Sequence, residues 1–113
     1  MSETNLYTIF LGTSLKNYED IQKEVEKKIY NILKNCDNKF STVGTIQLHS
    51  GKSMYHGKYA NIESAVTIYL IFNPKTNINL QDLYAKQFIL NLKKEFNQEV
   101  VLCFSNKCNN LSL

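Results

Sequence analysis

The residues best suited to chemistry gather in one stretch of the sequence, between positions 47 and 63. They combine amide, imidazole, ammonium, phenol and carboxylate groups, and they are Gln47, His49, Lys52, Tyr55, His56, Lys58 and Glu63. Ammonium groups bind phosphate, phenol rings stack on bases, and amides and carboxylates hydrogen-bond to bases and ribose. The stretch therefore predicts a binding site for a small nucleotide-type ligand. A hairpin that is polar only because it is exposed would have a similar composition.

The same stretch lacks a complete catalytic set. Glu63 and the two histidines could transfer protons, as in the hydrolysis of a nucleotide signal, but no Ser or Cys nucleophile with a base partner accompanies them. Two histidines seven residues apart, with no fourth ligand, do not define a metal site. Ser50-Gly51-Lys52-Ser53 lacks the upstream glycine of a phosphate-binding loop. We expect a binding protein without cofactor, metal or catalytic residues, and a small hydrolase is one alternative.

Charge argues against nucleic acid as the partner. The chain has 113 residues and a net charge of +3, its 13 basic residues are all Lys, and they are spread along the sequence. Tyr7, Phe10, Tyr59 and Tyr69 could stack bases on an open sheet face, although such aromatics more commonly fill a core or a subunit interface. An RNA-binding or protein-interaction module therefore remains the first alternative, ahead of the hydrolase.

Length and hydropathy predict one domain over residues 1–113, with a core over about 5–105 and a polar tail over 106–113. No apolar run is long enough to span a membrane, and the polar N-terminus does not resemble a signal peptide, so we expect a cytoplasmic protein. Cys36, Cys103 and Cys108 are odd in number and form no Cys-x-x-Cys pair, which argues against disulfides and zinc.

Hydrophobic periodicity predicts the elements that must position these residues. Strands are expected over 6–11, 40–49, 58–72 and 99–105, a loop over 50–57, and helices over about 17–34 and 79–97. The even positions of 58–72 are mostly apolar and are expected to face the core, as are Ile21, Val25, Ile29, Ile32 and Leu33 of the first helix. This order predicts an α+β ferredoxin-like plait (βαββαβ), with a four-stranded antiparallel sheet and two helices on one face. The other face stays uncovered, so we expect a homo-oligomer that meets through that face or through the tail.

The helices carry more specific expectations. Asn79 can cap the second helix with Asp82 in its first turn, and Lys28 belongs to a charged face of the first helix that is expected to be solvated. The apolar face of the second helix is expected to comprise Leu80, Leu83, Tyr84, Phe88, Ile89, Leu92 and Phe96.

Three short segments resemble a known family. They are Leu6-Tyr7, Glu63-Ser64 before the apolar run to Phe72, and Phe96-Asn97-Gln98-Glu99-Val100-Val101-Leu102. Together they resemble a family of small uncharacterised bacterial and phage proteins that end in Phe-x-Gln-Glu-Ser-Val-Leu, and Val100 stands here in place of the usual Ser. The resemblance implies a small α/β plait of mobile-element origin without an established activity. It adds Gln98 and Glu99 to Glu63 as candidate ligand-binding residues.

These observations lead to one functional hypothesis. A small phage protein with binding groups but no catalytic set would suit a sponge, an anti-defence protein that sequesters a host immune signalling nucleotide in the cytoplasm of the host cell. This step rests on analogy.

Overall fold

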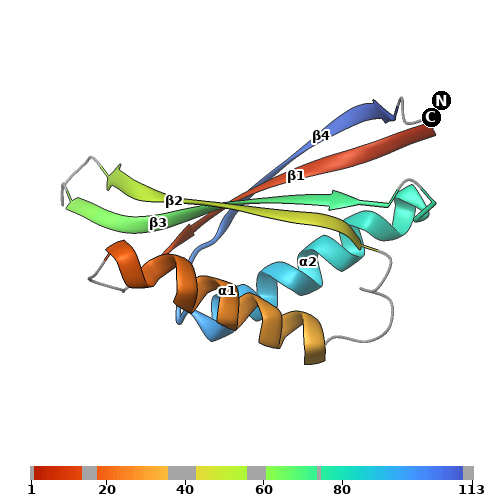
Figure 1. Cartoon of the computed structure of the whole chain (residues 1–113). Coiled ribbons are helices and arrows are strands. Elements are labelled where there is room, and N and C mark those ends of the chain that lie inside the picture. The colour runs from red at the N-terminus through yellow and green to blue at the C-terminus, as the bar shows by residue number, and fades with distance from the viewer. Residues whose placement is uncertain (1, 14–17, 36–42, 56–60, 74, 111–113) are drawn as a thin grey trace.

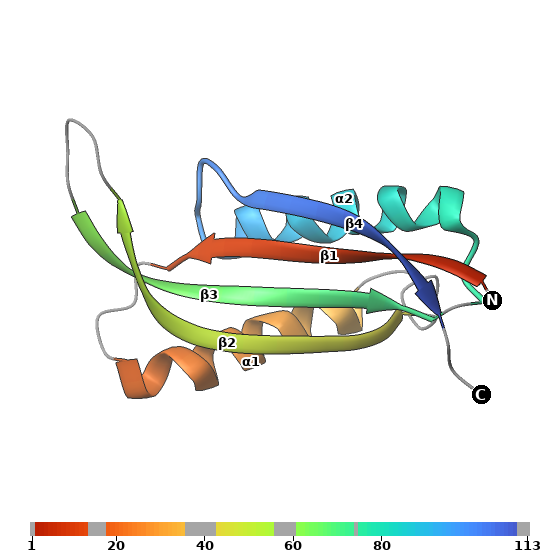
Figure 2. The ribbon, with the colours of Figure 1, turned by 90° about the horizontal axis from the view of Figure 1, so that it is seen from above.

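A computed structural model of the chain describes residues 2–13, 18–35, 43–55, 61–73 and 75–110 (Figure 1). Its elements, in chain order, are β1 (Ser2–Gly12), α1 (Tyr18–Asn35), β2 (Val43–Tyr55), β3 (Asn61–Phe72), α2 (Ile78–Glu95) and β4 (Leu102–Asn110). The strands lie in the order β2-β3-β1-β4, and every neighbouring pair is antiparallel. Both helices lie on the same face of the sheet, α1 beneath the β2 side and α2 beneath the β4 side (Figures 1 and 2).

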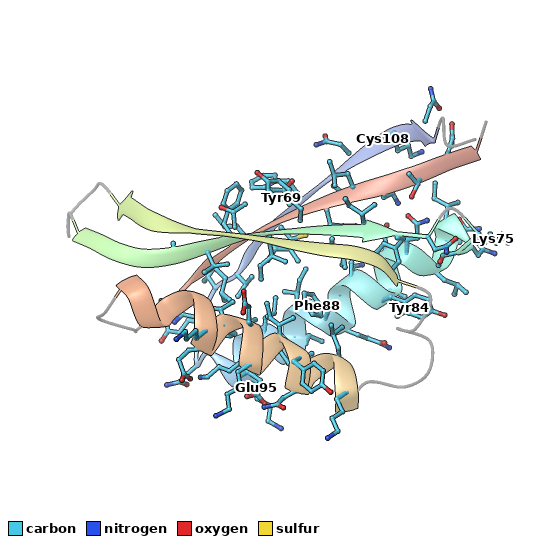
Figure 3. All side chains as sticks on the ribbon, viewed as in Figure 1. Tyr69, Lys75, Tyr84, Phe88, Glu95 and Cys108 are labelled. Carbon is cyan, nitrogen blue, oxygen red and sulfur yellow. The ribbon has the colours of Figure 1, made fainter. Side chains whose placement is uncertain are left out.

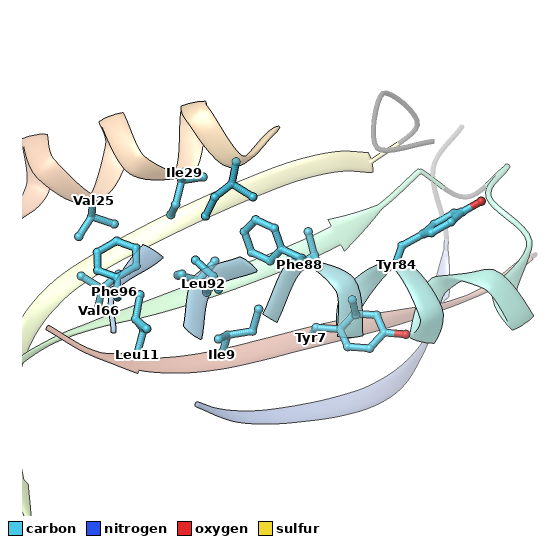
Figure 4. Packing of buried hydrophobic residues seen from close by; sticks show 14 of the residues in the cluster. Tyr7, Ile9, Leu11, Val25, Ile29, Val66, Tyr84, Phe88, Leu92 and Phe96 are labelled. Atoms are coloured by element: carbon cyan, nitrogen blue, oxygen red, sulfur yellow. The ribbon is translucent and has the colours of Figure 1, made fainter. Parts of the chain in front are cut away.

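The core fills the space between the sheet and the helices (Figure 4). Alternate residues of β3 face the helices, and Val66, Ile68, Leu70 and Phe72 are at most 1% exposed, which confirms the predicted pattern for these four positions. Strand β1 adds Tyr7, Ile9 and Leu11 to the core on the sheet side, and the helices and the end of α2 close it with Val25, Ile29, Ile32, Tyr84, Ala85, Phe88, Leu92 and Phe96.

The buried face of α2 differs from the predicted one. Leu80 and Leu83 are 40% and 47% exposed, whereas Gln81 is fully buried. The helix is capped by Asn77, whose side chain accepts a hydrogen bond from the backbone N–H of Asn79, so Asn79 is not the cap and Asp82 lies beyond the first turn. Within the part of the chain that the structure describes, neither helix is long and apolar enough to cross a membrane.

The sheet requires a correction to the predicted plait. Among the described residues, all four strands lie side by side over only five residues of β1, Leu6–Phe10. At Leu11 and Gly12 three strands remain, and beyond Gly12 the described pairing is that of β2 with β3. At the other end, Ser2–Asn5 pairs with β4 alone. The prediction of one four-stranded layer is therefore wrong over much of the sheet. The physical cause is stagger. The β1–β4 pair extends beyond the β2–β3 pair at one end of the sheet, and the β2–β3 pair extends beyond the β1–β4 pair at the other end.

Two predicted boundaries explain this stagger. The segment predicted as a loop after position 49 continues β2, and Ser50–Tyr55 pairs with Asn61–Val66. Residues 106–110, predicted as the start of a polar tail, extend β4 along the N-terminal half of β1. Both segments are rich in polar residues, which pair well in strands whose side chains remain partly in water. Gly44 lies where the β2–β3 register shifts, at an irregularity typical of a β-bulge.

Candidate functional site

Most of the predicted ligand-binding residues lie on the paired backbone of β2 and β3. In the register, Gln47 and His49 stand opposite Tyr69 and Thr67. Farther along, on the two-stranded part, the pairs are Lys52 with Ser64, Ser53 with Glu63, and Tyr55 with Asn61. Lys52, Tyr55 and Glu63 therefore belong to four successive cross-strand pairs of this two-stranded segment, which we call the β2–β3 ribbon. His56 and Lys58 lie outside the described residues.

The two remaining predicted residues, Gln98 and Glu99, lie between α2 and β4. They reach the same end of the sheet as the β2–β3 ribbon, because β4 begins at Leu102, which pairs with Phe10 in the row that also holds Thr67 and His49. Figure 2 shows the ribbon curving toward the side of the sheet on which β4 begins. The β2–β3 ribbon and the segment before β4 therefore lie toward the same end of the fold.

The backbone before Glu99 has a defined conformation. Asn97 has a positive φ of 50°, which is the left-handed conformation that ends many helices and that Asn tolerates better than most residues. The backbone N–H of Asn97 donates to Lys94 O and that of Gln98 donates to Lys93 O, at 3.3 and 3.0 Å, so the turn is a Schellman motif. The Gln98 side chain donates to Phe96 O, and Glu99 is exposed.

The uncovered face of the sheet carries an apolar patch. Four of its large side chains are at least 36% exposed, and they are Phe10, Ile71, Leu102 and Phe104. The rings of Phe10 and Phe104 meet edge to face with centroids 6.0 Å apart, and Tyr69 stands on the same face (Figure 3). Among the described side chains of β1, β3 and β4, the register places no charged one on this face. Of the aromatics proposed to stack bases, Tyr7 is instead part of the core.

The opposite face holds a polar network that the sequence patterns did not reveal. Gln81 Oε1 accepts the backbone N–H of Asn5 at 2.9 Å, and Gln81 Nε2 donates to Thr4 Oγ1 and Thr76 O at 3.4 and 3.3 Å. β3 pairs with β1 only from Leu6 onward, so the Gln81 amide supplies an acceptor where that strand has ended. The burial of Gln81 could have been predicted from the helical spacing that it shares with the buried residues Tyr84, Ala85, Phe88 and Leu92.

A phenol and a carboxylate extend this network. The hydroxyl of Tyr7 donates to Asp82 Oδ1 and accepts from Asn5 Nδ2. Burial, and then the hydrogen bond to Asp82, raises the pKa of Tyr7 well above its ordinary value. Burial, and then the charge of Asp82, likewise raises the pKa of Cys103, so this thiol is a poor nucleophile at neutral pH. The network thus stabilises the fold and offers no activated group.

Metal ligands do not converge in the described part of the molecule. No group of three or more His, Cys, Asp or Glu side chains gathers there in a way that could hold an ion. The side chains of His49, His56 and Glu63 are outside this statement. The described residues thus define an α+β protein with a staggered sheet, and the backbone of Lys52, Tyr55 and Glu63 lies at one end of it.

Comparison with solved structures places this fold among known proteins. A phage SAM lyase in its apo state is similar at 17% identity, with 93% of this chain and 81% of that chain covered and a TM-score of 0.70. A phage SAM lyase in complex with S-methyl-5′-thioadenosine is similar at 16% identity, with coverages of 90% and 79% and a TM-score of 0.56. CutA from Pyrococcus horikoshii is similar at 11% identity, with coverages of 96% and 88% and a TM-score of 0.54.

Sequence comparisons add no family. No protein-family model matches the chain, and no curated protein matches it either. At these identities the structural likeness establishes a shared fold, and the fold extends over almost the whole chain.

Proposed function

We propose that this protein binds an adenosine-containing small molecule of the S-adenosylmethionine (SAM) class. The observation that carries the proposal is the likeness of nearly the whole chain to a phage SAM lyase, a fold that has also been seen with S-methyl-5′-thioadenosine bound. The position of the β2–β3 ribbon and of the Gln98–Glu99 turn toward the same end of the sheet supports it. This ligand class is more specific than the nucleotide-type ligand that the sequence predicts.

The chemistry of SAM suits the candidate residues. SAM presents an adenine, a ribose diol, a sulfonium cation, an ammonium group and a carboxylate. In the proposal, the carboxylates of Glu63 and Glu99 compensate the cationic groups, Lys58 attracts the carboxylate, and Tyr55 stacks on adenine. The proposed hydrogen-bonding residues are Gln47, His49, His56 and Gln98.

Retention and cleavage of the ligand are the two candidate outcomes. A protein that holds SAM without changing it would act as a sponge in the cytoplasm of a phage-infected cell, in line with the sequence-based hypothesis. A second candidate function is SAM cleavage, which is favoured by the activity named for the similar structures. In such a cleavage, the bond between the sulfonium sulfur and the aminobutyrate chain would break with its electron pair going to sulfur, which gives S-methyl-5′-thioadenosine. The carboxylate of the same chain would close on the freed carbon to give a lactone, so no water is consumed. The two outcomes therefore differ in what can be recovered after incubation.

The test is a titration of the purified chain with SAM, followed by mass spectrometry of the ligand. We expect SAM at 100 times its Kd to stabilise the fold by about 2.7 kcal/mol and to raise Tm by about 10 °C. Glu99→Gln and Glu63→Gln should each weaken binding about tenfold, because each removes a charge that faces a cation. Gln87→Glu, on the exposed surface of α2, is the control and should bind like the wild type.

The readout separates the alternatives. Intact SAM after incubation supports a sponge, and S-methyl-5′-thioadenosine in excess over protein supports a lyase. If neither SAM nor S-methyl-5′-thioadenosine changes Tm, while a cyclic dinucleotide or an ADP-ribose nucleotide does, the SAM class is wrong. If no nucleotide binds, the proposal as a whole fails.

We also propose that a second copy of the chain covers the apolar sheet face. Aromatic side chains without charges are typical of the centre of protein interfaces, whereas an RNA-binding face needs basic residues. A face without described charges can meet its own copy without repulsion, as a symmetric interface requires.

Replacing Phe104 by Asp places a charge in the apolar patch beside Phe10 and is expected to dissociate the assembly, because burying an unpaired charge is costly. Light scattering after size exclusion should give a multiple of 13.1 kDa for the wild type and about the monomer mass for the variant. Leu90→Asp, at a 64% exposed position of α2, is the matched control and should leave the assembly intact. A wild-type mass of one chain would contradict the proposed interface.

A further inference from the structure

Lys28 is the lysine of α1 that makes a specific contact with α2. Its Nζ donates a hydrogen bond to Glu95 O at 3.0 Å and lies 4.8 Å from the ring centroid of Phe96. The sequence pattern assigns Lys28 to a solvated charged face, but its side chain is half-buried, while its neighbour Lys27 is exposed. One ammonium group therefore contacts both the last residue of α2 and the residue that follows it.

This contact has a clear physical basis. The last carbonyl groups of a helix have no partner within the helix, and they form the negative end of the helix dipole. The ammonium of Lys28 supplies a donor and a positive charge there, and the ring of Phe96 adds a cation–π contact. Glu95 lies beside α1 at this end of the helix pair (Figure 3).

Backbone contacts within the turn after α2 also fix its conformation. The left-handed Asn97 and the hydrogen bond from Gln98 N–H to Lys93 O fix the backbone on one side, and Lys28 fixes Glu95 and Phe96 on the other. Phe96 is 5% exposed and belongs to the core. The chain therefore leaves the core in one defined direction immediately before Glu99.

We propose that Lys28 is a positioning residue for the candidate ligand-binding turn at Gln98 and Glu99, an inference that rests on the proposed function. It contacts no ligand itself; it holds the end of α2 so that the turn is already ordered before the ligand arrives. Pre-ordering raises affinity because binding then no longer includes the loss of conformational entropy that fixing the turn would require.

The test compares Lys28→Met with the matched Lys27→Met in two measurements. In calorimetric titration with SAM, Lys28→Met should weaken binding about tenfold and Lys28→Arg should restore it to within threefold, since Arg keeps the charge and the donors. Lys27→Met should bind like the wild type. In hydrogen exchange, the amides of Asn97 and Gln98 should exchange about tenfold faster in Lys28→Met, while those of β3 keep their rates.

The outcomes distinguish this inference from the proposed function. Equal SAM affinity for Lys28→Met and Lys27→Met would overturn the positioning role. So would unchanged exchange at Asn97 and Gln98 in Lys28→Met. If the wild type does not bind SAM, the proposed function fails by itself. Faster exchange of these amides would then still support Lys28 as the residue that orders the turn.

Discussion

Replacing Gln81 by Leu is expected to lower the free energy of unfolding by about 3 kcal/mol, a large part of the roughly 10 kcal/mol of a domain of this size. Leu has nearly the same volume, so little cavity forms. The loss arises because the buried N–H of Asn5 and the carbonyl of Thr76 lose their Gln81 partners. Urea unfolding, followed by the midpoint at constant m value, measures the effect.

Gln87→Leu provides the matched control for this prediction. Gln87 lies on the same helix but is exposed, so its replacement should change stability by less than about 0.5 kcal/mol. If Gln81→Leu proved as stable as Gln87→Leu, the amide of Gln81 would not be the partner that the end of β1 requires.

Replacing Tyr7 by Phe is expected to lower the free energy of unfolding by about 2 kcal/mol at neutral pH, because the Tyr7 hydroxyl bonds to both Asp82 and Asn5. Tyr30→Phe is the control, since Tyr30 is 65% exposed, and it should have little effect. Thermal and urea unfolding of the two variants and the wild type give the comparison.

The same pair of variants tests the titration of Tyr7. The pKa of Tyr7 is raised in the fold above its ordinary value of 10.0, so the unfolded chain releases this proton first as the pH rises. The stabilisation is fully present below pH 10 and is lost above it, by up to about 1.4 kcal/mol per pH unit. Tyr7→Phe lacks this loss, and its stability should approach that of the wild type between pH 10 and 12. A difference that stays constant over this range would contradict the prediction.

The sequence predicts much of this fold because its apolar periodicity is strong. Even positions of β3 and the spacing of Val25, Ile29 and Ile32 in α1 identify buried positions correctly, since burial of apolar side chains dominates folding. The prediction fails where polar residues adopt regular structure. Ser50–Tyr55 and Lys107–Asn110 pair as strands although neither has an apolar pattern, because cross-strand hydrogen bonds depend on the partner strand and not on side-chain hydropathy.

The candidate site was only partly predictable for a related reason. Sequence proximity identified the stretch from Gln47 to Glu63, and a resemblance identified Gln98 and Glu99. That both lie at one end of the sheet follows from the register of β4 against β1, which no local pattern encodes. Lys28 was assigned to a solvated face because helical spacing gives a neighbour on the same helix, whereas its contact lies 67 residues away.

The stagger of the sheet has an evolutionary consequence. Past Gly12, no third strand pairs with β2 and β3 in the described part of the chain, so insertions or exchanges there would leave the pairing of β1 with β4 unchanged. Selection can diversify this two-stranded part of β2 and β3 from one lineage to the next without destabilising the rest of the sheet. We therefore expect relatives with this fold to align poorly along the two-stranded part of β2 and β3, even where they recognise the same molecule.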